Sequence, residues 1–152
     1  MTKNHRRLSY CLFASAVALC IGCNRIAEWS LPRHNMKSEL NTFGAATRMI
    51  IRDDHDQLKK DTTDRQDIDI VVALFKKYPA GWMEFSGAGG DYDILLYQGS
   101  TATWRLGLTV GGIKSGEDTL IIWPRFRRVP VDEVTTVVRK LGLQWPTRAR
   151  LP

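Results

Sequence analysis

Apolar residues recur at helical spacing in two stretches of the chain, 64–78 and 130–142. Each stretch places four of them at i, i+3, i+4 and i+7, the pattern of a helix with one buried face. They are Ile68, Val71, Val72 and Phe75 in the first stretch, and Val134, Val137, Val138 and Leu141 in the second. Acids precede and basic residues follow the apolar positions, as the helix dipole favours, so we predict two helices.

Around these helices the apolar period changes to two. The clearest case is 102–110, where Trp104, Leu106, Leu108 and Val110 alternate with polar residues or glycine. Short turns separate such stretches, which favours an antiparallel meander. Strands are predicted at 47–52, 82–85, 92–98, 102–110 and 120–124, whereas the charged stretch 53–64 is predicted to be a surface loop.

The apolar faces of the helices and of the sheet can be buried only against each other. We therefore expect an α+β fold, with an antiparallel sheet of about four to five strands packed against two helices as a two-layer sandwich. The expected single domain spans 46–145 and is followed by a short tail at 146–152.

Residues 1–22 have the layout of a signal peptide. Lys3, Arg6 and Arg7 make a basic start without acids, and the stretch from Leu8 to Gly22 holds no charged residue. That apolar stretch is short for a membrane-spanning helix, which needs about 20 apolar residues. We therefore expect the rest of the chain to be exported.

Cys20 and Cys23 form a C-x-x-C pair, a spacing typical of a redox dithiol or of half a zinc site. A redox dithiol would be expected within a βαβ pattern, and none surrounds the pair. A zinc site would need two further ligands, and no second C-x-x-C or histidine pair follows. The stretch instead resembles the cleavage region of bacterial lipoprotein precursors. Gly22 matches the small residue of that family and Cys23 its lipidated cysteine, while Cys20 stands where the family usually has leucine.

The resemblance implies that Cys23 carries palmitate-type acyl chains and begins the mature protein, with 23–45 as a tether. Asn24 at the next position implies delivery to the outer membrane, facing the periplasm. The membrane is then one partner, through the anchor. The alternatives are an uncleaved N-terminal anchor, or ordinary cleavage after Ala14-Ser15-Ala16, an A-x-A site inside the apolar run.

Net charge changes once the signal is removed. The whole chain carries +6, but Lys3, Arg6 and Arg7 leave with residues 1–22, so the mature part carries +3. A mild positive excess is ordinary for solubility and does not indicate nucleic acid. We expect no nucleic-acid partner.

Asp53, Asp54, His55 and Asp56 make the most metal-like stretch of the chain. A calcium loop starting at Asp54 would need glycine at its sixth position and an acid at its twelfth. Lys59 and Arg65 stand at those positions, so a solvated loop is favoured and the four residues are weak metal candidates. They support an alternative function as a small metal-dependent, hydrolase-like enzyme.

The glycine-rich stretch SGAGGDYD at 86–93 is a second candidate, because glycine loops can cradle phosphates. That fingerprint requires a helix after the glycines, and here a strand is predicted, so a wide loop or hairpin is favoured. A small-ligand site there stays an alternative. Glu84, Asp91 and Asp93 could also act as paired carboxylates if the fold brings them together.

The stretch WPRFRRVP at 123–130 is the most promising for binding. It places Arg125, Arg127 and Arg128 around Phe126, and arginine beside aromatic residues suits a carboxylate, a phosphate or a protein surface. The alternative is that the aromatic residues belong to the core and the arginines only solvate an edge.

Together these patterns predict an envelope-associated binding or interaction module with an envelope protein as a possible partner. No cofactor and no catalytic residue are predicted, since 24–152 contains no cysteine and only His34 and His55 as histidines.

Overall fold

The computed structural model describes residues 32–84, 90–109 and 117–144, and those from Arg33 onward belong to one compact unit. Strands account for most of the ordered elements. They are β1 (His34–Asn35), β2 (Arg48–Asp53), β3 (Leu58–Thr62), β4 (Ala80–Glu84), β5 (Tyr92–Gln98), β6 (Thr101–Thr109), β7 (Glu117–Ile122) and β8 (Arg125–Pro130). The helices are α2 (Lys37–Thr42), α3 (Arg65–Lys76), α4 (Val131–Lys140) and a short 3-10 turn, η1 (Phe43–Ala45).

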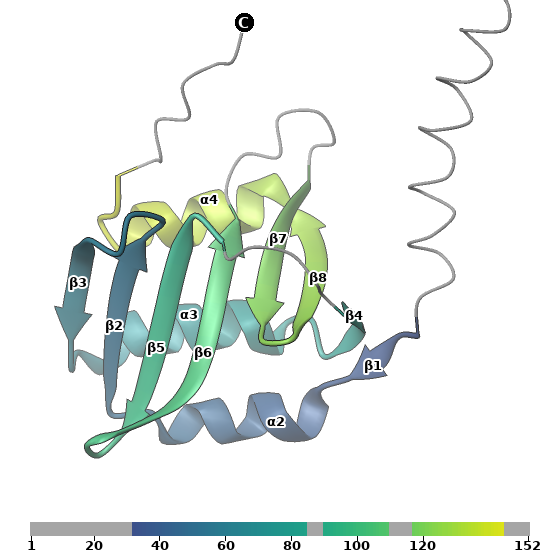
Figure 1. Cartoon of the computed structure of the whole chain (residues 1–152), viewed down its shortest axis with the longest axis horizontal. Helices are drawn as coiled ribbons and strands as arrows, with labels where there is room; N and C mark the ends of the chain where they lie inside the picture. The colour runs from purple at the N-terminus through teal and green to yellow at the C-terminus, as the bar shows by residue number, and fades with distance from the viewer. Residues whose placement is uncertain (1–31, 85–89, 110–116, 145–152) are drawn as a thin grey trace, which may run out of the picture. The chain divides into compact units, whose positions relative to one another are not determined.

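All eight strands join one antiparallel sheet in the order β1-β4-β8-β7-β6-β5-β2-β3 (Figure 1). From β5 to β8 the order follows the chain as hairpins. The first strands flank this meander on both sides, with β2 and β3 beside β5 and with β4 and β1 beside β8.

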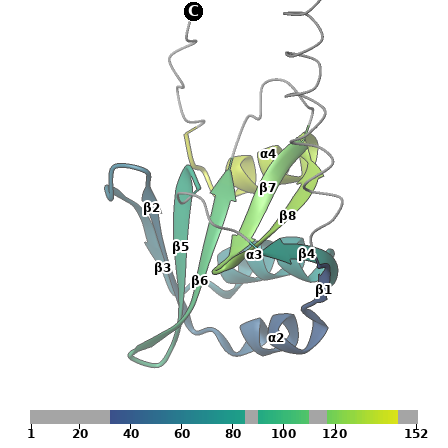
Figure 2. The same ribbon diagram turned by 45° about the vertical axis from the view of Figure 1, so that its right-hand side comes forward.

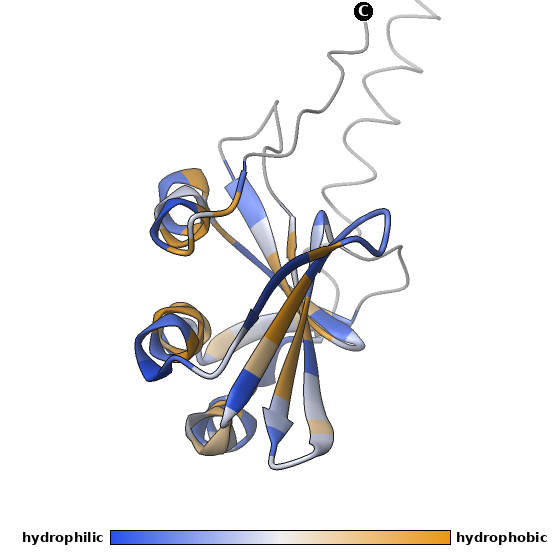
Figure 3. Ribbon diagram, turned by 90° about the vertical axis from the view of Figure 1, so that its left-hand side faces the viewer, coloured by the Kyte–Doolittle hydropathy of each residue, from blue (hydrophilic) through white to orange (hydrophobic). Residues whose placement is uncertain are grey.

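The three α-helices lie on one face of the sheet, and views from two directions agree on this (Figures 1 and 2). Figure 3 shows the sheet from its side, with apolar positions on the helices turned toward the strands. The buried residues of α3 include Ile68, Val71 and Phe75. Within 32–84, 90–109 and 117–144, every helix uses the same face, so no helix of these segments covers the other face of the sheet.

Aromatic residues link the helices to the strands. The Phe43 ring lies 6.3 Å from that of Phe75 and 5.6 Å from that of Trp104, while Phe75 stacks on Trp82 at 6.2 Å. The buried Trp82 indole donates from Nε1 to the Tyr78 carbonyl at 2.6 Å. This hydrogen bond satisfies a buried donor. The ring contacts hold η1, α3 and β4 together, and they hold η1 against β6.

The predicted sheet of about four to five strands packed against two helices is wrong. The structure has one large eight-stranded antiparallel sheet and three short α-helices, so the fold is mainly β. The prediction omitted β3 and β8, because 58–62 and 125–130 are strongly polar and lack apolar alternation. Both segments join the sheet through backbone hydrogen bonds, which do not depend on the side chains.

The segment 33–45 also differs from its predicted role in a tether. It forms β1, α2 and η1, and it buries Met36, Leu40 and Phe43. These residues stand at i, i+4 and i+7, the spacing of one helix face. The signal was present but covered fewer than two turns of α-helix, too short to stand out.

Candidate functional site

The predicted basic edge is divided between two faces of β8. Arg127 lies on the face of Val129, which belongs to the helix-covered core, and alternation places Arg125 on that face as well. Phe126 and Arg128 lie on the opposite face. The four residues therefore do not form one continuous surface.

Phe126 contributes to packing on the face without helices. It pairs with Met83 of β4 and with Ile121 of β7, and both neighbours are buried. Arg127 also has a structural contact, since its Nη1 donates to the Gly81 carbonyl at 3.3 Å. A side chain at Gly81 would overlap the guanidinium of Arg127.

Arg125 lines a pocket between α2 and the β7–β8 turn, which we call the α2 pocket. Its volume is about 510 Å³, within the range of small-molecule sites. Its apolar lining consists of Met36, Phe43, Trp104, Ile122 and Trp123, and its polar lining consists of Ser38, Glu39, Thr42 and Arg125. An apolar wall with few polar groups is the usual composition of a ligand pocket.

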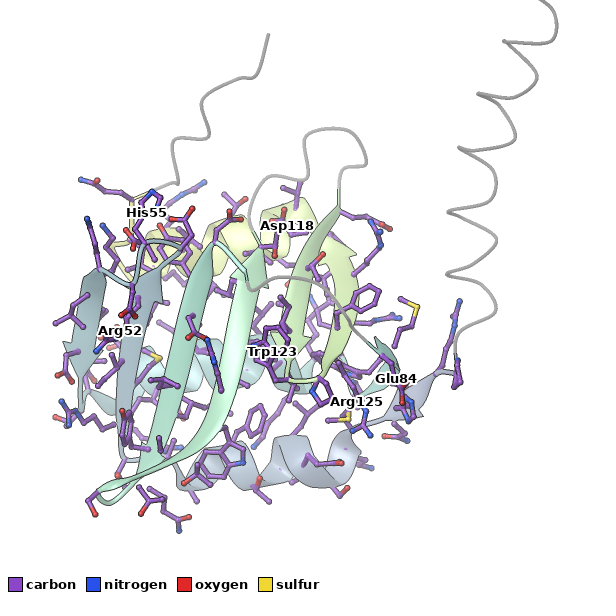
Figure 4. The ribbon with its side chains drawn as sticks, viewed as in Figure 1. Arg52, His55, Glu84, Asp118, Trp123 and Arg125 are labelled. Atoms are coloured by element: carbon purple, nitrogen blue, oxygen red, sulfur yellow. The ribbon has the colours of Figure 1, made fainter. Side chains whose placement is uncertain are left out.

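Trp123 is the exposed aromatic residue of this pocket, with 37% of its surface accessible. It stands in the turn after β7, and Figure 4 shows it beside the sheet, with Arg125 nearer to α2. The Arg105 guanidinium lies over its ring, 5.9 Å from the centroid. Arg105 lies on the face of β6 opposite to Leu106, so this cation–π contact holds the indole toward the face of the sheet away from the helices.

The Arg125 guanidinium has weak partners for a charged group. Its Nη1 lies 3.0 Å from the Met36 thioether sulfur and 3.9 Å from a Glu39 carboxylate oxygen, and its buried Nε has no hydrogen-bond partner. A thioether is a weak acceptor, and an unpaired buried donor costs about 1–3 kcal/mol. Among the described residues, Arg125 therefore has no strong hydrogen-bond acceptor.

Glu39 supplies the negative charge at this pocket. Its pKa is lowered mainly by a hydrogen bond from its own backbone N–H, then by the Ser38 hydroxyl, which donates to it at 2.8 Å, and further by the charge of Arg125. Glu39 is thus ionised at neutral pH. The pocket thus holds one cation and one anion whose nearest atoms are 3.9 Å apart, too far for a hydrogen bond.

A larger groove of about 880 Å³ lies between α3 and α4. Its main charged pair, Lys77 and Glu133, is already joined by an ion pair, and Asp69 pairs with Arg65 at 2.7 Å. The groove is larger, but these charges are matched within the protein. We therefore regard the α2 pocket as the better candidate site.

The Asp53–Asp56 loop is the turn between β2 and β3. Asp53 accepts from the backbone N–H of His55 and Gln57 and pairs with Lys59 at 2.8 Å. The Lys59 ammonium, together with these backbone bonds, lowers the pKa of Asp53. Asp53 is thus occupied in holding the turn.

No group of three His, Cys, Asp or Glu side chains that could hold a metal ion occurs in 32–84, 90–109 or 117–144. Asp56 pairs instead with Arg52 at 3.0 Å, and His55 lies 3.8 Å from Asp54. In Figure 4 His55 stands at the β2–β3 turn, away from Arg125.

The sheet order separates Glu84 from Asp91 and Asp93, the other two carboxylates considered for paired catalysis, which lie two residues apart at the start of β5. Glu84 is on β4 and Asp93 is on β5, and three strands lie between them. At about 4.8 Å per strand this places them roughly 19 Å apart. Asp93 is engaged with Arg105, whose Nε lies 3.0 Å from both carboxylate oxygens. Residues 86–89 of the glycine-rich stretch lie outside the described part.

Sequence reasoning identified Arg125 but missed the residues that surround it. The pattern predicts Trp104 on the core side, where it does pack, without indicating the pocket; Met36, Glu39 and Phe43 fall in the predicted tether. Only their arrangement in three dimensions shows that 36–43 lies against the β7–β8 turn.

The comparisons with known proteins found no match: no family model fits the chain, and neither a curated protein nor a solved structure is similar to it. In the described segments, no helix combines the length and the apolar character needed to cross a membrane. Cys23 and the predicted signal lie outside the described residues.

Proposed function

We propose that this protein is a lipid-anchored binding protein of a bacterial cell envelope, with the α2 pocket as its ligand site. The anchor is proposed from the sequence of residues 1–23, in which a basic start and an apolar stretch end at Gly22-Cys23. A binding role agrees with the composition of the pocket. The anchor would attach the chain to a membrane.

The observation that carries the binding role is the state of Arg125 inside an aromatic pocket. Its partners are a thioether at 3.0 Å and a carboxylate at 3.9 Å. Trp123 and Trp104 provide apolar surface in the same pocket. A small ligand can cover the apolar walls of such a pocket and accept the hydrogen bonds that the charged group does not make with the described residues.

Blocking the pocket tests this role. Thr42 lines the pocket from the exposed side of α2, so Thr42→Trp should fill it without disturbing the core. In a thermal-shift screen of the full chain against organic acids, amines, sugars and neutral aromatic compounds, a ligand at 100 times its Kd should stabilise the wild type by about 2.7 kcal/mol. Thr42→Trp should abolish the shift.

The control is Thr101→Trp, which adds the same side chain at an exposed position outside the pocket and should keep the shift. A shift that survives Thr42→Trp would place the ligand elsewhere. If no compound class shifts the wild-type protein, the pocket is not a small-molecule site.

A further inference from the structure

We infer that the ligand of the α2 pocket is a small amphipathic carboxylic acid, bound with its carboxylate on Arg125 and its apolar body against the tryptophans. This inference rests on the proposed function and names the class of ligand. It follows from the unmet hydrogen bonds of one charged group, from the lining of the pocket and from the position of a competing carboxylate.

The first step concerns the hydrogen bonds of Arg125. A guanidinium presents its N–H donors in a planar fork that matches the two oxygens of a carboxylate. Arg125 uses one of its donors on the Met36 sulfur at 3.0 Å, and its Nε is buried without a partner. A ligand carboxylate would replace a weak acceptor with a strong one at the end of the guanidinium.

The second step concerns the rest of the ligand. Of the nine residues that line the pocket, five are apolar, and three of those are the aromatic residues Phe43, Trp104 and Trp123. A free inorganic anion would leave this surface exposed to water. An acid with an aromatic or short aliphatic body covers it and gains from burial of apolar area.

The third step concerns Glu39, because removing its negative charge changes the affinity for an acid and for an amine in opposite directions. Glu39 is a carboxylate 3.9 Å from Arg125, so it competes with an acidic ligand for the same guanidinium and repels it. For a ligand cation the reverse holds, since aromatic rings beside a carboxylate attract ammonium groups. Neutralising Glu39 should therefore strengthen the binding of an acid and weaken the binding of an amine.

The experiment uses three probes with one apolar body and different charges. Binding of 3-phenylpropanoate, 3-phenylpropanamide and 3-phenylpropylamine to the full chain is measured by isothermal titration calorimetry. The acid should bind at least about tenfold more tightly than the amide, because a hydrogen bond to a charged group is worth about 1.5–3 kcal/mol. The amine should bind more weakly than the amide.

Variants then assign the preference to Arg125. Arg125→Met should remove the advantage of the acid over the amide, and Arg125→Lys should keep part of it, because it retains the charge but loses the fork. Glu39→Gln should raise the affinity for the acid by about threefold, the size expected for a partly exposed charge pair. Glu39 is well exposed, so this variant should fold normally.

Matched controls remove the same charges elsewhere. Arg48→Met removes an arginine from β2, where its partner is Asp61, and Glu117→Gln removes an acid from the exposed start of β7. Neither residue lines the pocket. Both controls should bind all three probes as the wild type does.

Three results would overturn the inference. Equal affinity for the acid and the amide shows an apolar pocket without anion recognition. Tighter binding of the amine, with loss on Glu39→Gln, shows a cation site. Both of these leave the proposed binding role intact. Absence of binding for all three probes overturns the inference, and the thermal-shift screen then decides separately whether the proposed function fails too.

Discussion

At the scale of single residues, two glycines allow the chain to cross the backbone of β6. A side chain at Gly90 would have its Cβ 2.5 Å from the Leu108 carbonyl oxygen, and one at Gly107 would have its Cβ 3.2 Å from Ile121. The neighbours of Gly90 are backbone atoms of a central strand, which cannot move aside. Glycine is therefore required here for close approach of two backbones.

We expect Gly90→Ala to lower the free energy of unfolding by about 1–3 kcal/mol, the usual cost of overpacking. Gly44→Ala is the control, because a Cβ there meets only the end of the Lys76 side chain at 3.5 Å. It should be neutral or should stabilise by up to about 1 kcal/mol. Urea unfolding of the two variants measures both effects, and equal stability of the two would show that the close approach at Gly90 carries no cost.

Residues of the candidate site were only partly predictable. Arg125 was identified because arginine beside aromatic residues is a local pattern. Glu39 was not, because its importance comes from lying 3.9 Å from a residue 86 positions later in the chain. A single sequence contains no local signal for such a contact.

At the scale of elements, α3 was predictable because its whole structure is encoded locally. Its apolar face follows the helical period, and Asp64 caps its start by accepting from the Gln66 N–H at 2.9 Å. The strand β3 is the opposite case. It is attached to the helices by Lys60, which pairs with Asp67 at 2.8 Å and donates to the Leu141 carbonyl at 3.0 Å. Leu141 is 81 positions away, and neither contact produces an apolar pattern in 58–62, so the strand was predicted to be a loop.

The N-cap of α3 gives a prediction at this scale. Asp64→Ala should lower the free energy of unfolding by about 1 kcal/mol, because an N-cap side chain satisfies an otherwise unpaired helix N–H. Asp69→Ala removes the same charge from the same helix, but it breaks only an exposed ion pair with Arg65. That control should cost less than about 0.5 kcal/mol. Chemical denaturation compares them, and equal losses would indicate a charge effect rather than capping.

At the scale of the whole molecule, the sequence predicted the antiparallel meander better than the size of the sheet. The period-two stretches marked the central strands β5, β6 and β7. The flanking strands were harder, since β8 carries arginines on its helix-facing side and β1 contains only two residues. Apolar alternation reports how strongly a strand is buried, not whether it is paired, so the fold class was misjudged.

The proposed anchor also gives a prediction for the whole chain. In a bacterial host, Cys23→Ser should abolish labelling by radioactive palmitate and should leave the protein unprocessed at that position. Mass spectrometry of the native product should find acyl chains on Cys23 as its first residue. Replacing Cys11, a cysteine of the apolar stretch outside the cleavage region, by serine is the control and should leave labelling unchanged. An intact Met1 on the wild-type product would contradict the lipoprotein assignment.

The short strand β1 has a mechanical consequence. It is held to β4 through only two residue pairs, and α2 follows directly, with Met36 N–H donating to the Pro79 carbonyl at 2.7 Å. Tension applied to the chain before His34 would peel this strand away first and would next pull α2 from the β7–β8 turn. Glu39 would then separate from Arg125, while the central strands would stay hydrogen-bonded to one another. If the pocket binds a ligand as proposed, pulling on the N-terminal segment would open it while the central strands remain paired, and ligand release would then depend on force.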